Sequence, residues 1–214
     1  NYATMTINGG ELAGNTATER GGAIYLESPS STVAASRLTI NNGNIYSNCA
    51  QTHYGQGGAI YIAPSSVSTK SNTVDMYGGK IYENLSRGQG VVAVRLYGVF
   101  NMYGGEIYSN SRGLVNEDKS MTAIDDRGSG VYVNGGTFKM AKSDLSSSIP
   151  TIRDNTGWHG SAIDIENGTV DLSHGLITNN INRLGNGNTT YYGAIFAQAG
   201  TLNIGGDISI YGNQ

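Results

Sequence analysis

The chain holds a small set of residues that combine rings, carboxylates and positive charge in a way suited to ligand recognition. They are His53, Tyr54, Arg87, Asp125, Asp126, Arg127, Trp158, His159 and Tyr191. Rings flanked by carboxylates and Arg suit sugars, because the C–H faces of a sugar pack on rings while its hydroxyls hydrogen-bond to charged groups. We therefore predict that these residues bind a glycan or a protein. The alternative is that Trp158 only covers an edge of the fold and that the acids are solvated.

The same set invites comparison with catalytic sites. Polysaccharide hydrolases use two carboxylates as general acid and base, and inverting enzymes hold them roughly 6.5–9.5 Å apart. Asp125 and Asp126, with His159 further along, are weakly similar to the catalytic set of the pectin-degrading hydrolases. The Gly-His-Gly and Arg-Ile-Lys segments of that set are missing. We therefore expect no catalytic residue, and a polysaccharide hydrolase or lyase is the alternative.

The spacing of the acidic residues does not favour a metal-dependent enzyme. A calcium-dependent lyase would need several Asp residues on one sheet face and a catalytic Arg or Lys. Asp75 and Asp171 fall on equivalent predicted strands, but Asn101 and Lys139 stand between them. The Gly-Gly-x-Gly-x-Asp calcium repeat is also absent. The sequence thus predicts neither a metal site nor a cofactor.

The candidate residues are scattered along the chain, so only a repeated fold can gather them. One unit, apolar-x-apolar-x-Gly/Asn-Gly-x-apolar-x-x-Asn, recurs in seven copies, two of them with insertions. A second unit, Gly-Ala-Ile-Tyr-apolar, alternates with it, for example at residues 22–26 and 58–62. Successive terminal Asn residues are 33, 36, 26, 45, 25 and 33 positions apart. This spacing indicates fixed strands joined by turns of variable length.

These units predict an all-β chain, a right-handed parallel β-helix (solenoid) of about seven coils with three short strands per coil. Within a strand the period is two, so Ile24 and Leu26 should face the core while Tyr25 faces outward. A β-propeller and a β-sandwich are the alternatives, but both need hairpins, and the Asn-Gly pairs here do not join equivalent strands. We expect residues 1–214 to form a single domain.

In such a fold the turns also stack, so segments at one corner share one face. The segments between each terminal Asn and the next Gly-Ala-Ile unit belong to one corner, and they contain every candidate ligand residue. They are residues 16–20, 49–56, 85–89, 111–129, 156–160 and 181–192. Long loops on a rigid scaffold are where binding usually resides. We therefore place the predicted site at this corner.

Two further sets of residues should stack from coil to coil. The terminal Asn side chains can hydrogen-bond to one another and to turn backbone, and we interpret them as structural. This asparagine ladder comprises Asn15, Asn48, Asn84, Asn110, Asn155, Asn180 and Asn213. Tyr46, Tyr82 and Tyr108 should form an outward column of stacked rings. That column either stabilises the fold or binds an extended ligand.

Composition narrows the classes of function. Gly makes up 32 of 214 residues, Pro only 3, and charged residues 14 %, which is typical of β-structure with tight turns. With a net charge of −3 and no basic block, nucleic acid is not an expected partner. No apolar run is long enough for membrane insertion by this segment. The single Cys49 excludes an internal disulfide. Because the chain starts and stops within repeats, we expect a segment of a larger protein, whose other domains are candidate partners.

The paired motifs resemble those of a known family. Gly-Gly-Ala-Ile-Tyr at 21–25 and 57–61, with Ile-Tyr-Ser-Asn at 45–48 and 107–110, resembles the repeats of chlamydial polymorphic outer-membrane proteins. Repeats in large surface proteins of Gram-positive gut bacteria are more similar still. The resemblance covers essentially the whole chain and implies a secreted or wall-anchored adhesin with a right-handed β-helix. Ile or Leu replaces the chlamydial Phe before x-x-Asn, so no binding residue of that family is carried over.

From the repeat and the resemblance we expect an extracellular, cell-surface module of a bacterial protein, with a structural and adhesive role in host interaction. Its partner would be a glycan or protein on a host or neighbouring cell, bound at the corner defined above. A polysaccharide-active enzyme and a stalk without ligand are the alternatives.

Overall fold

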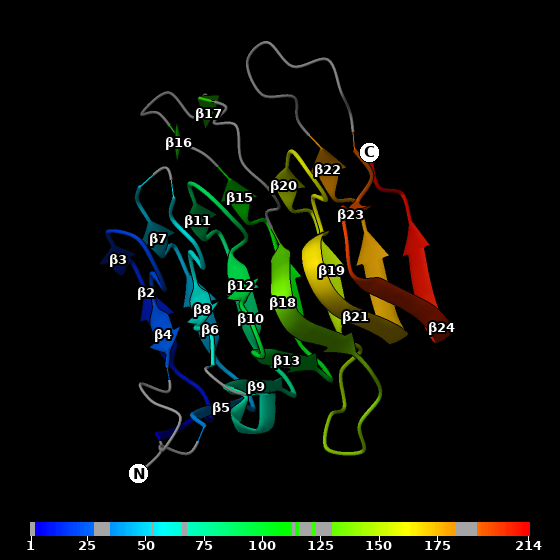
Figure 1. Ribbon diagram of the computed structural model, residues 1–214, viewed down its shortest axis with the longest axis horizontal. Coiled ribbons are helices and arrows are strands. Elements are labelled where there is room, and N and C mark those ends of the chain that lie inside the picture. The colour runs from blue at the N-terminus through cyan, green and yellow to red at the C-terminus, as the bar shows by residue number, and fades with distance from the viewer. Residues whose placement is uncertain are drawn as a thin grey trace.

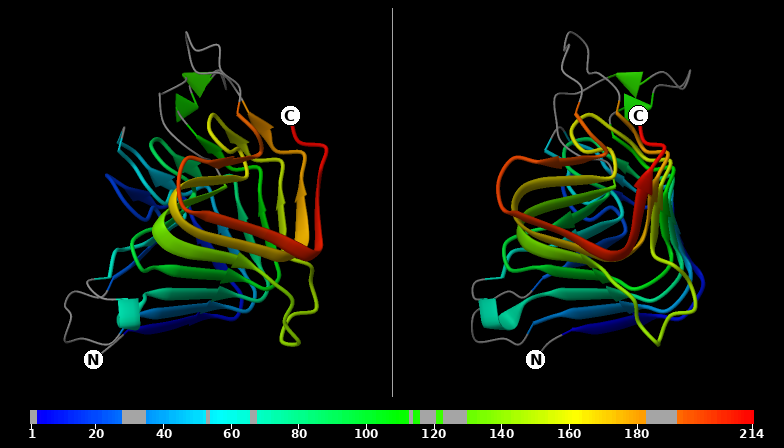
Figure 2. Two further views of the ribbon diagram at one scale, coloured as in Figure 1. Left: turned by 45° about the vertical axis from the view of Figure 1, so that its right-hand side comes forward. Right: turned by 90° about the vertical axis from the view of Figure 1, so that its right-hand side faces the viewer.

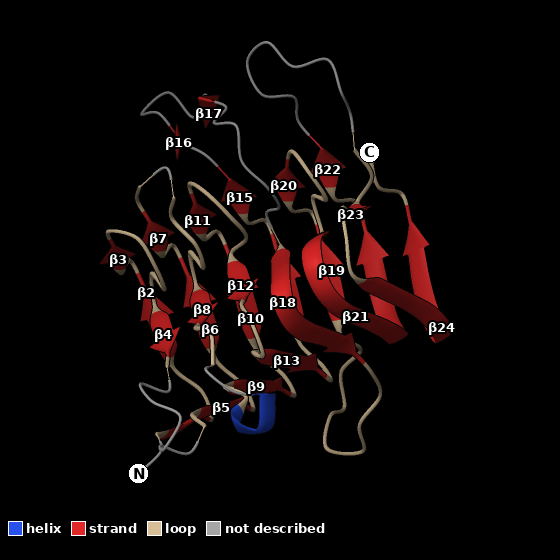
Figure 3. Ribbon diagram, viewed as in Figure 1, coloured by secondary structure: helices blue, strands red, loops and turns tan. Residues whose placement is uncertain are grey.

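The computed structural model describes residues 3–27, 35–52, 54–65, 68–112, 114–115, 121–122, 130–182 and 192–214. These residues form strands and turns, and one short 3-10 helix, η1 (Ser68–Lys70), is the helical element among them (Figure 3). The expectation of an all-β chain built from parallel strands is confirmed. The sequence repeats lie side by side along the long axis of the molecule, and equivalent strands of successive repeats pair with each other (Figure 1).

The apolar-x-apolar motif forms the first strand column. Its members are β1 (Thr4–Ile7), β5 (Arg37–Ile40), β9 (Thr73–Met76), β13 (Val99–Met102) and parts of the long strands β18 (Val131–Met140), β21 (Ile163–Thr178) and β24 (Thr201–Tyr211). The register aligns the motif copies residue for residue, so that Leu38 lies beside Val74 and Val74 beside Phe100. Residues at equivalent positions of the sequence repeat are therefore the residues that pair in the sheet.

The stretch that follows each Gly pair forms the second strand column. It contains β2 (Glu11–Ala13), β6 (Asn44–Tyr46), β10 (Lys80–Tyr82), β14 (Glu106–Tyr108), β19 (Thr151–Arg153) and the ends of β21 and β24. Its middle residue points inward in each copy, and Ile45, Ile81 and Ile107 are buried.

The Gly-Ala-Ile-Tyr units form the third strand column. It contains β4 (Ile24–Leu26), β8 (Ile60–Ile62), β12 (Val92–Val94), the first halves of β18 and β21, and β23 (Ile195–Ala197). The inward side chains of all three columns make one continuous core, which includes the stacked rings of Phe100 and Phe138. Seen along the row of repeats, the columns enclose this core (Figure 2).

The prediction of three short strands per repeat is incomplete in two ways. Residues after each ladder Asn form a fourth strand column: β3 (Thr16–Ala17), β7 (Cys49–Ala50), β11 (Leu85–Ser86), β15 (Ser111–Arg112), β20 (Thr156–Gly157) and β22 (Ile181–Asn182). In the later repeats β18, β21 and β24 also run through a corner unbroken. The pairing of these long strands shifts register near Asn134 and at Leu172. An irregular residue of this kind lets a strand bend at the corner without ending. A separate antiparallel pair, β16 (Leu114–Val115) and β17 (Met121–Thr122), lies beyond the fourth column.

The asparagine side chains of the predicted ladder hydrogen-bond from each repeat to the next. Asn84 shows the pattern, since its Nδ2 donates to Oδ1 of Asn110 at 3.1 Å and to the Ile45 carbonyl at 2.9 Å. Its Oδ1 accepts from the backbone N and from Nδ2 of Asn48, at 3.0 and 2.9 Å. The same side-chain contact links Asn15 to Asn48 and continues to Asn213. Each amide thus satisfies backbone groups that the turn leaves unpaired.

The residue before each ladder Asn adopts a left-handed backbone conformation. In the first and last copies it is glycine, Gly14 and Gly212, with φ of 67° and 66°. In the other copies it carries a side chain, with φ between 50° and 56° at Ser47, Glu83, Ser109, Asp154 and Asn179. Side chains disfavour this region. The turn into the ladder therefore carries strain in each of these five copies.

Candidate functional site

The structure brings the described parts of the turns that were expected to share a corner to one side of the molecule, along its long axis. Strands β3, β7, β11, β15, β20 and β22 lie in a row there, and described segments such as 54–56, 87–89 and 158–160 follow them (Figure 1). Isolated bridges extend the row, because Gln56 pairs with Arg20 and with Gln89. Tyr54, Arg87, Trp158 and His159 all lie on these segments. The other predicted ligand residues, His53, Asp125, Asp126, Arg127 and Tyr191, lie outside the described residues.

Trp158 and His159 belong to a cluster of four rings at this corner. The His159 ring lies 4.5 Å from that of Trp158, 4.2 Å from Tyr192 and 4.8 Å from Phe196, measured between centroids. The rings of Tyr192 and Phe196 are 4.7 Å apart. All four side chains are half-buried, and their planes are tilted or perpendicular to one another. Edge-to-face contacts such as those of Tyr192 with His159 and Phe196 are a preferred geometry of aromatic pairs.

Tyr192 lies on the predicted corner segment 181–192, next to the predicted ligand residue Tyr191, and Phe196 is the member of this cluster that the sequence reasoning missed altogether. It occupies the outward position of β23, where earlier repeats have Tyr25 and Tyr61. The signal was present in the sequence, because Gly-Ala-Ile-Phe at 193–196 is a copy of Gly-Ala-Ile-Tyr. Only the fold shows that this column runs underneath the predicted corner.

The structure gives Arg87 and Tyr54 different surroundings from the ring cluster. Nη1 of Arg87 donates to the Gln51 carbonyl at 2.7 Å, which ties together the turns of two adjacent repeats. Nearby, burial raises the pKa of the Cys49 thiol above its usual value, and the charge of Arg87 offsets this only in part. The thiolate that a reactive cysteine needs is thereby disfavoured. Tyr54 is 77 % exposed at the surface of this corner.

The outward side of the third strand column is buried in its middle repeats, contrary to the expectation set by Tyr25. Tyr61, Ala93, Tyr132 and Asp164 are at most 2 % exposed, whereas Tyr25 is 43 % exposed. Arginines cover two of the rings, since Cζ of Arg20 lies 5.5 Å from the centroid of Tyr61 and Cζ of Arg95 5.7 Å from that of Tyr132. A second, smaller apolar cluster therefore lies between this column and the turns.

Tyr132 is the centre of a polar network on that buried side. Its hydroxyl donates a short hydrogen bond to Oε2 of Glu166 and accepts from Nη1 of Arg95 at 3.3 Å and Nδ2 of Asn134 at 3.1 Å. Burial raises the pKa of this phenol well above its usual value, and the bond to Glu166 raises it further. Tyr132 is therefore held as the neutral phenol. Asp164 lies beside it in register on β21 and is also buried.

The two acids considered for a calcium-dependent lyase each interact with a cationic side chain and with an asparagine amide. Oδ2 of Asp75 accepts from Nη1 of Arg37 and Oδ1 from Nδ2 of Asn101, both at 2.8 Å. Asp171 accepts from Asn203 at 2.6 Å and has Lys139 Nζ at 3.9 Å. Within the described part of the chain, no group of three His, Cys, Asp or Glu residues is placed to hold a metal ion.

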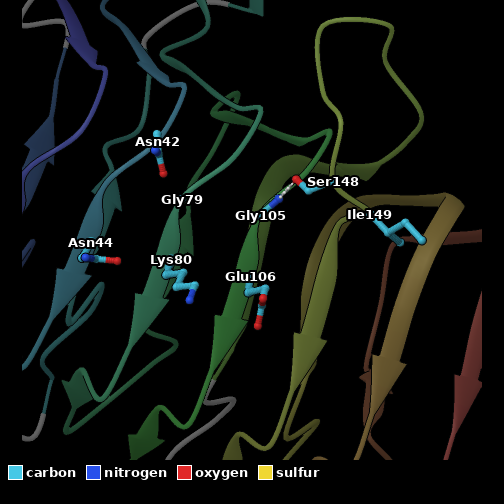
Figure 4. A pocket seen from close by; sticks show the side chains of 8 residues that line it. All are labelled: Asn42, Asn44, Gly79, Lys80, Gly105, Glu106, Ser148 and Ile149. Atoms are coloured by element: carbon cyan, nitrogen blue, oxygen red, sulfur yellow. Dashed lines mark hydrogen bonds between the residues drawn. The ribbon is translucent and has the colours of Figure 1, made fainter.

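A second surface of interest lies on the second strand column. The rings of Tyr46, Tyr82 and Tyr108 stack with centroids 5.0 Å apart and planes within 6° and 11° of parallel. Beside them a groove of about 520 Å³ runs across strands β6, β10 and β14 (Figure 4). It is lined by Asn42, Asn44, Gly79, Lys80, Gly105, Glu106, Ser148 and Ile149. The sequence indicated the ring column, but the groove depends on a loop whose position the repeat does not determine.

Comparison of the chain with models of known protein families, with curated protein sequences and with solved structures gives no match. Along the part of the chain that the structure describes, no helix has the length and apolar character needed to cross a lipid bilayer.

Proposed function

We propose that this chain is a right-handed parallel β-helix of about seven coils, the fold that its repeats predict. The residue-for-residue parallel register and the stacked asparagines support a solenoid, in which each repeat contacts only its neighbours. Connections between parallel strands are right-handed in nearly all proteins, which supports the hand. In this reading residues 1–214 form one domain, a rigid rod that holds its turns at fixed positions.

Its proposed function is that of an extracellular structural and adhesive module of a bacterial surface protein. The ligand is a glycan or a protein on a host or neighbouring cell, and it binds at the corner that carries the four-ring cluster. The observation that carries this proposal is the contact set of His159 with Trp158, Tyr192 and Phe196, half-buried on a rigid scaffold. Large aromatic side chains held in place dominate most binding surfaces. The resemblance to surface-protein repeats supports the extracellular setting.

Binding of the purified chain to a glycan array and to cultured cells tests this function. Trp158→Ala should weaken the binding at least about tenfold, because buried aromatic anchors contribute at least ~2 kcal/mol. Leu145→Ala is the matched control, since Leu145 is an exposed apolar residue, 77 % accessible, on the loop between β18 and β19. Equal binding by the wild-type and Trp158→Ala chains would refute the proposed site. Absence of binding to every glycan and cell type would favour a stalk.

The alternative of a polysaccharide-active enzyme is supported by one contact. Asp164, a buried carboxyl group, is the register partner of Phe196, whose ring contacts His159. Glycoside hydrolases use a pair of carboxyl groups, and Asp164 would supply one of them. Release of reducing ends from pectin or mucin glycans, lost in Asp164→Asn and in Asp126→Asn, would favour this alternative over the adhesive module.

A further inference from the structure

A line of hollows runs along the second strand column, on a different part of the surface from the four-ring cluster. The groove of about 520 Å³ shares Asn44 with a hollow of about 310 Å³ that reaches Glu11. It shares Ser148 and Ile149 with a third hollow of about 150 Å³. The three hollows are therefore neighbours, and together they are called the corner groove.

The floor of the corner groove is a row of polar side chains in exact strand register. Glu11 pairs with Asn44, Asn44 with Lys80 and Lys80 with Glu106, each at the first position of its strand. Neighbouring strands are about 4.8 Å apart, so these four groups span on the order of 15 Å. Figure 4 shows Asn44, Lys80 and Glu106 projecting from three adjacent strands. The row offers carboxylate acceptors at its two ends, with the amide of Asn44 and the ammonium donor of Lys80 between them.

The tyrosine stack lies beside this row, two residues further along the same strands. The facing sides of the Tyr46, Tyr82 and Tyr108 rings cover one another, so the stack offers mainly ring edges and hydroxyl groups. A ligand in the groove can hydrogen-bond along this edge. The stack is rigid, because parallel stacking and the strand register hold each ring in place.

One wall of the groove is formed by the insertion between β18 and β19, which is fixed to the corner. Oγ of Ser146 donates to the Tyr77 carbonyl at 2.6 Å, and the backbone N of Gly105 donates to Oγ of Ser148 at 2.9 Å. These bonds hold Ile149 at the end of the groove, where it is 59 % exposed. An apolar side chain held open to solvent beside a polar row suits a ligand with both C–H faces and hydroxyls.

We propose that the corner groove binds an extended, neutral polysaccharide lengthwise, with one sugar residue per repeat. Formal charges of the lining residues cancel, because Glu11 and Glu106 are matched by Lys80 and Lys142. This balance disfavours a polyanion, which needs a surplus of cations. A straight row with a spacing near the length of one pyranose ring selects a ribbon-like β-linked chain over a curved α-linked one. The proposal is independent of ligand binding at the four-ring cluster.

Isothermal titration calorimetry with cello- and chito-oligosaccharides, from disaccharide to hexasaccharide, tests the groove. Affinity should rise with length and level off near the tetrasaccharide, and malto-oligosaccharides of equal length should bind more weakly. Lys80→Met should weaken binding about tenfold, since a hydrogen bond from a charged donor is lost. Ile149→Ser should weaken it severalfold. The matched controls Lys139→Met and Leu145→Ser, on the first column and elsewhere on the same loop, should bind like the wild-type chain.

Several outcomes would overturn the proposal. These are no binding of any neutral oligosaccharide, preferential binding of polygalacturonate, or the same loss in Lys139→Met as in Lys80→Met. Trp158→Ala separates the two sites, because Trp158 does not line the groove. Binding lost in Trp158→Ala and kept in both groove variants would refute the groove and leave the proposed function standing. The reverse pattern would support the groove and show that these oligosaccharides do not bind at the corner site.

Discussion

Arg153 lies over the ring of Tyr108, with Cζ 4.2 Å from the ring centroid, and so closes the stack of three tyrosines on the second strand column. The two residues are register partners on β14 and β19. The guanidinium is also fixed by Glu106, to which Nε and Nη2 donate at 3.0 and 2.7 Å, and by Asp154 at 2.6 Å. A cation over an exposed ring face contributes roughly 0.5–1 kcal/mol. The stack therefore ends in a cation–π contact, beside the row of polar residues on the same strands.

Removing the central ring should show how much this stack stabilises the fold. Tyr82→Ser removes both ring contacts and should lower the free energy of unfolding by about 1–3 kcal/mol, since each aromatic pair contributes roughly 0.5–1.5 kcal/mol. Tyr82→Phe keeps both contacts and should remain close to the wild type. Urea denaturation followed by circular dichroism measures both. If the Tyr82→Ser variant were as stable as the wild type, the stack would not contribute to the free energy of unfolding.

The asparagine ladder should be sensitive at its buried centre. Asn84→Leu leaves the Ile45 carbonyl and the backbone N of Asn48 without their partners, and both are buried. Each such group costs about 1–3 kcal/mol, so the variant should lose about 3 kcal/mol or more of unfolding free energy. The matched control is Asn42→Leu in the preceding repeat, because Asn42 is exposed. Equal melting temperatures for the two variants would contradict a structural role of the ladder.

The left-handed residue before the ladder Asn predicts an unusual stabilising substitution. Glu83 is exposed and has a φ of 54°, a conformation that Gly14 and Gly212 adopt at the equivalent position. Glu83→Gly should therefore raise the free energy of unfolding by up to about 1 kcal/mol, because relief of strain exceeds the entropy cost of glycine. Lys80→Gly on the neighbouring strand β10 is the control and should be destabilising by roughly 0.5–1 kcal/mol. Destabilisation by both substitutions would show that the turn is unstrained.

Stability should fall in alkaline solution because of the buried phenol of Tyr132. Its pKa is raised in the folded chain by burial and by the Glu166 contact, so the folded state disfavours loss of the proton. Tyrosine in an unfolded chain loses its proton near pH ~10. The contribution of Tyr132 is therefore complete below about pH 10 and declines as the pH rises above that value.

Chemical denaturation between neutral and strongly alkaline pH measures this effect. Tyr132→Phe should be less stable than the wild type at neutral pH, because Arg95 and Asn134 lose an acceptor. Its stability should fall less steeply at alkaline pH, since one titrating group is gone. Tyr54→Phe, at an exposed position, should follow the wild-type curve. A Tyr132→Phe curve with the wild-type slope would mean that other groups account for the alkaline loss.

Part of the candidate surface could be read from the repeat. The equivalence of Tyr46, Tyr82 and Tyr108 in the sequence became three stacked rings, because equal positions in a parallel register must lie side by side. Arg153 occupies the next place in that column but was not recognised, since the insertion before it hides the alignment. Trp158 and His159 were assigned to the right corner from turn position alone. Their contacts with Tyr192 and Phe196 come from a later repeat and a different strand column.

The amino-acid sequence by itself determined the parallel β architecture, the register of the repeats and the inward residues, because a period of two within strands and a repeated motif act locally. It also placed Asn84 and its equivalents, whose partners are one repeat away. The tertiary structure alone decided that Tyr61 and Tyr132 on the outward side are buried, and that the loop carrying Ile149 closes a groove. Those outcomes depend on how turns of unequal length pack across the strands, and contacts of that kind leave no periodic signal in the chain.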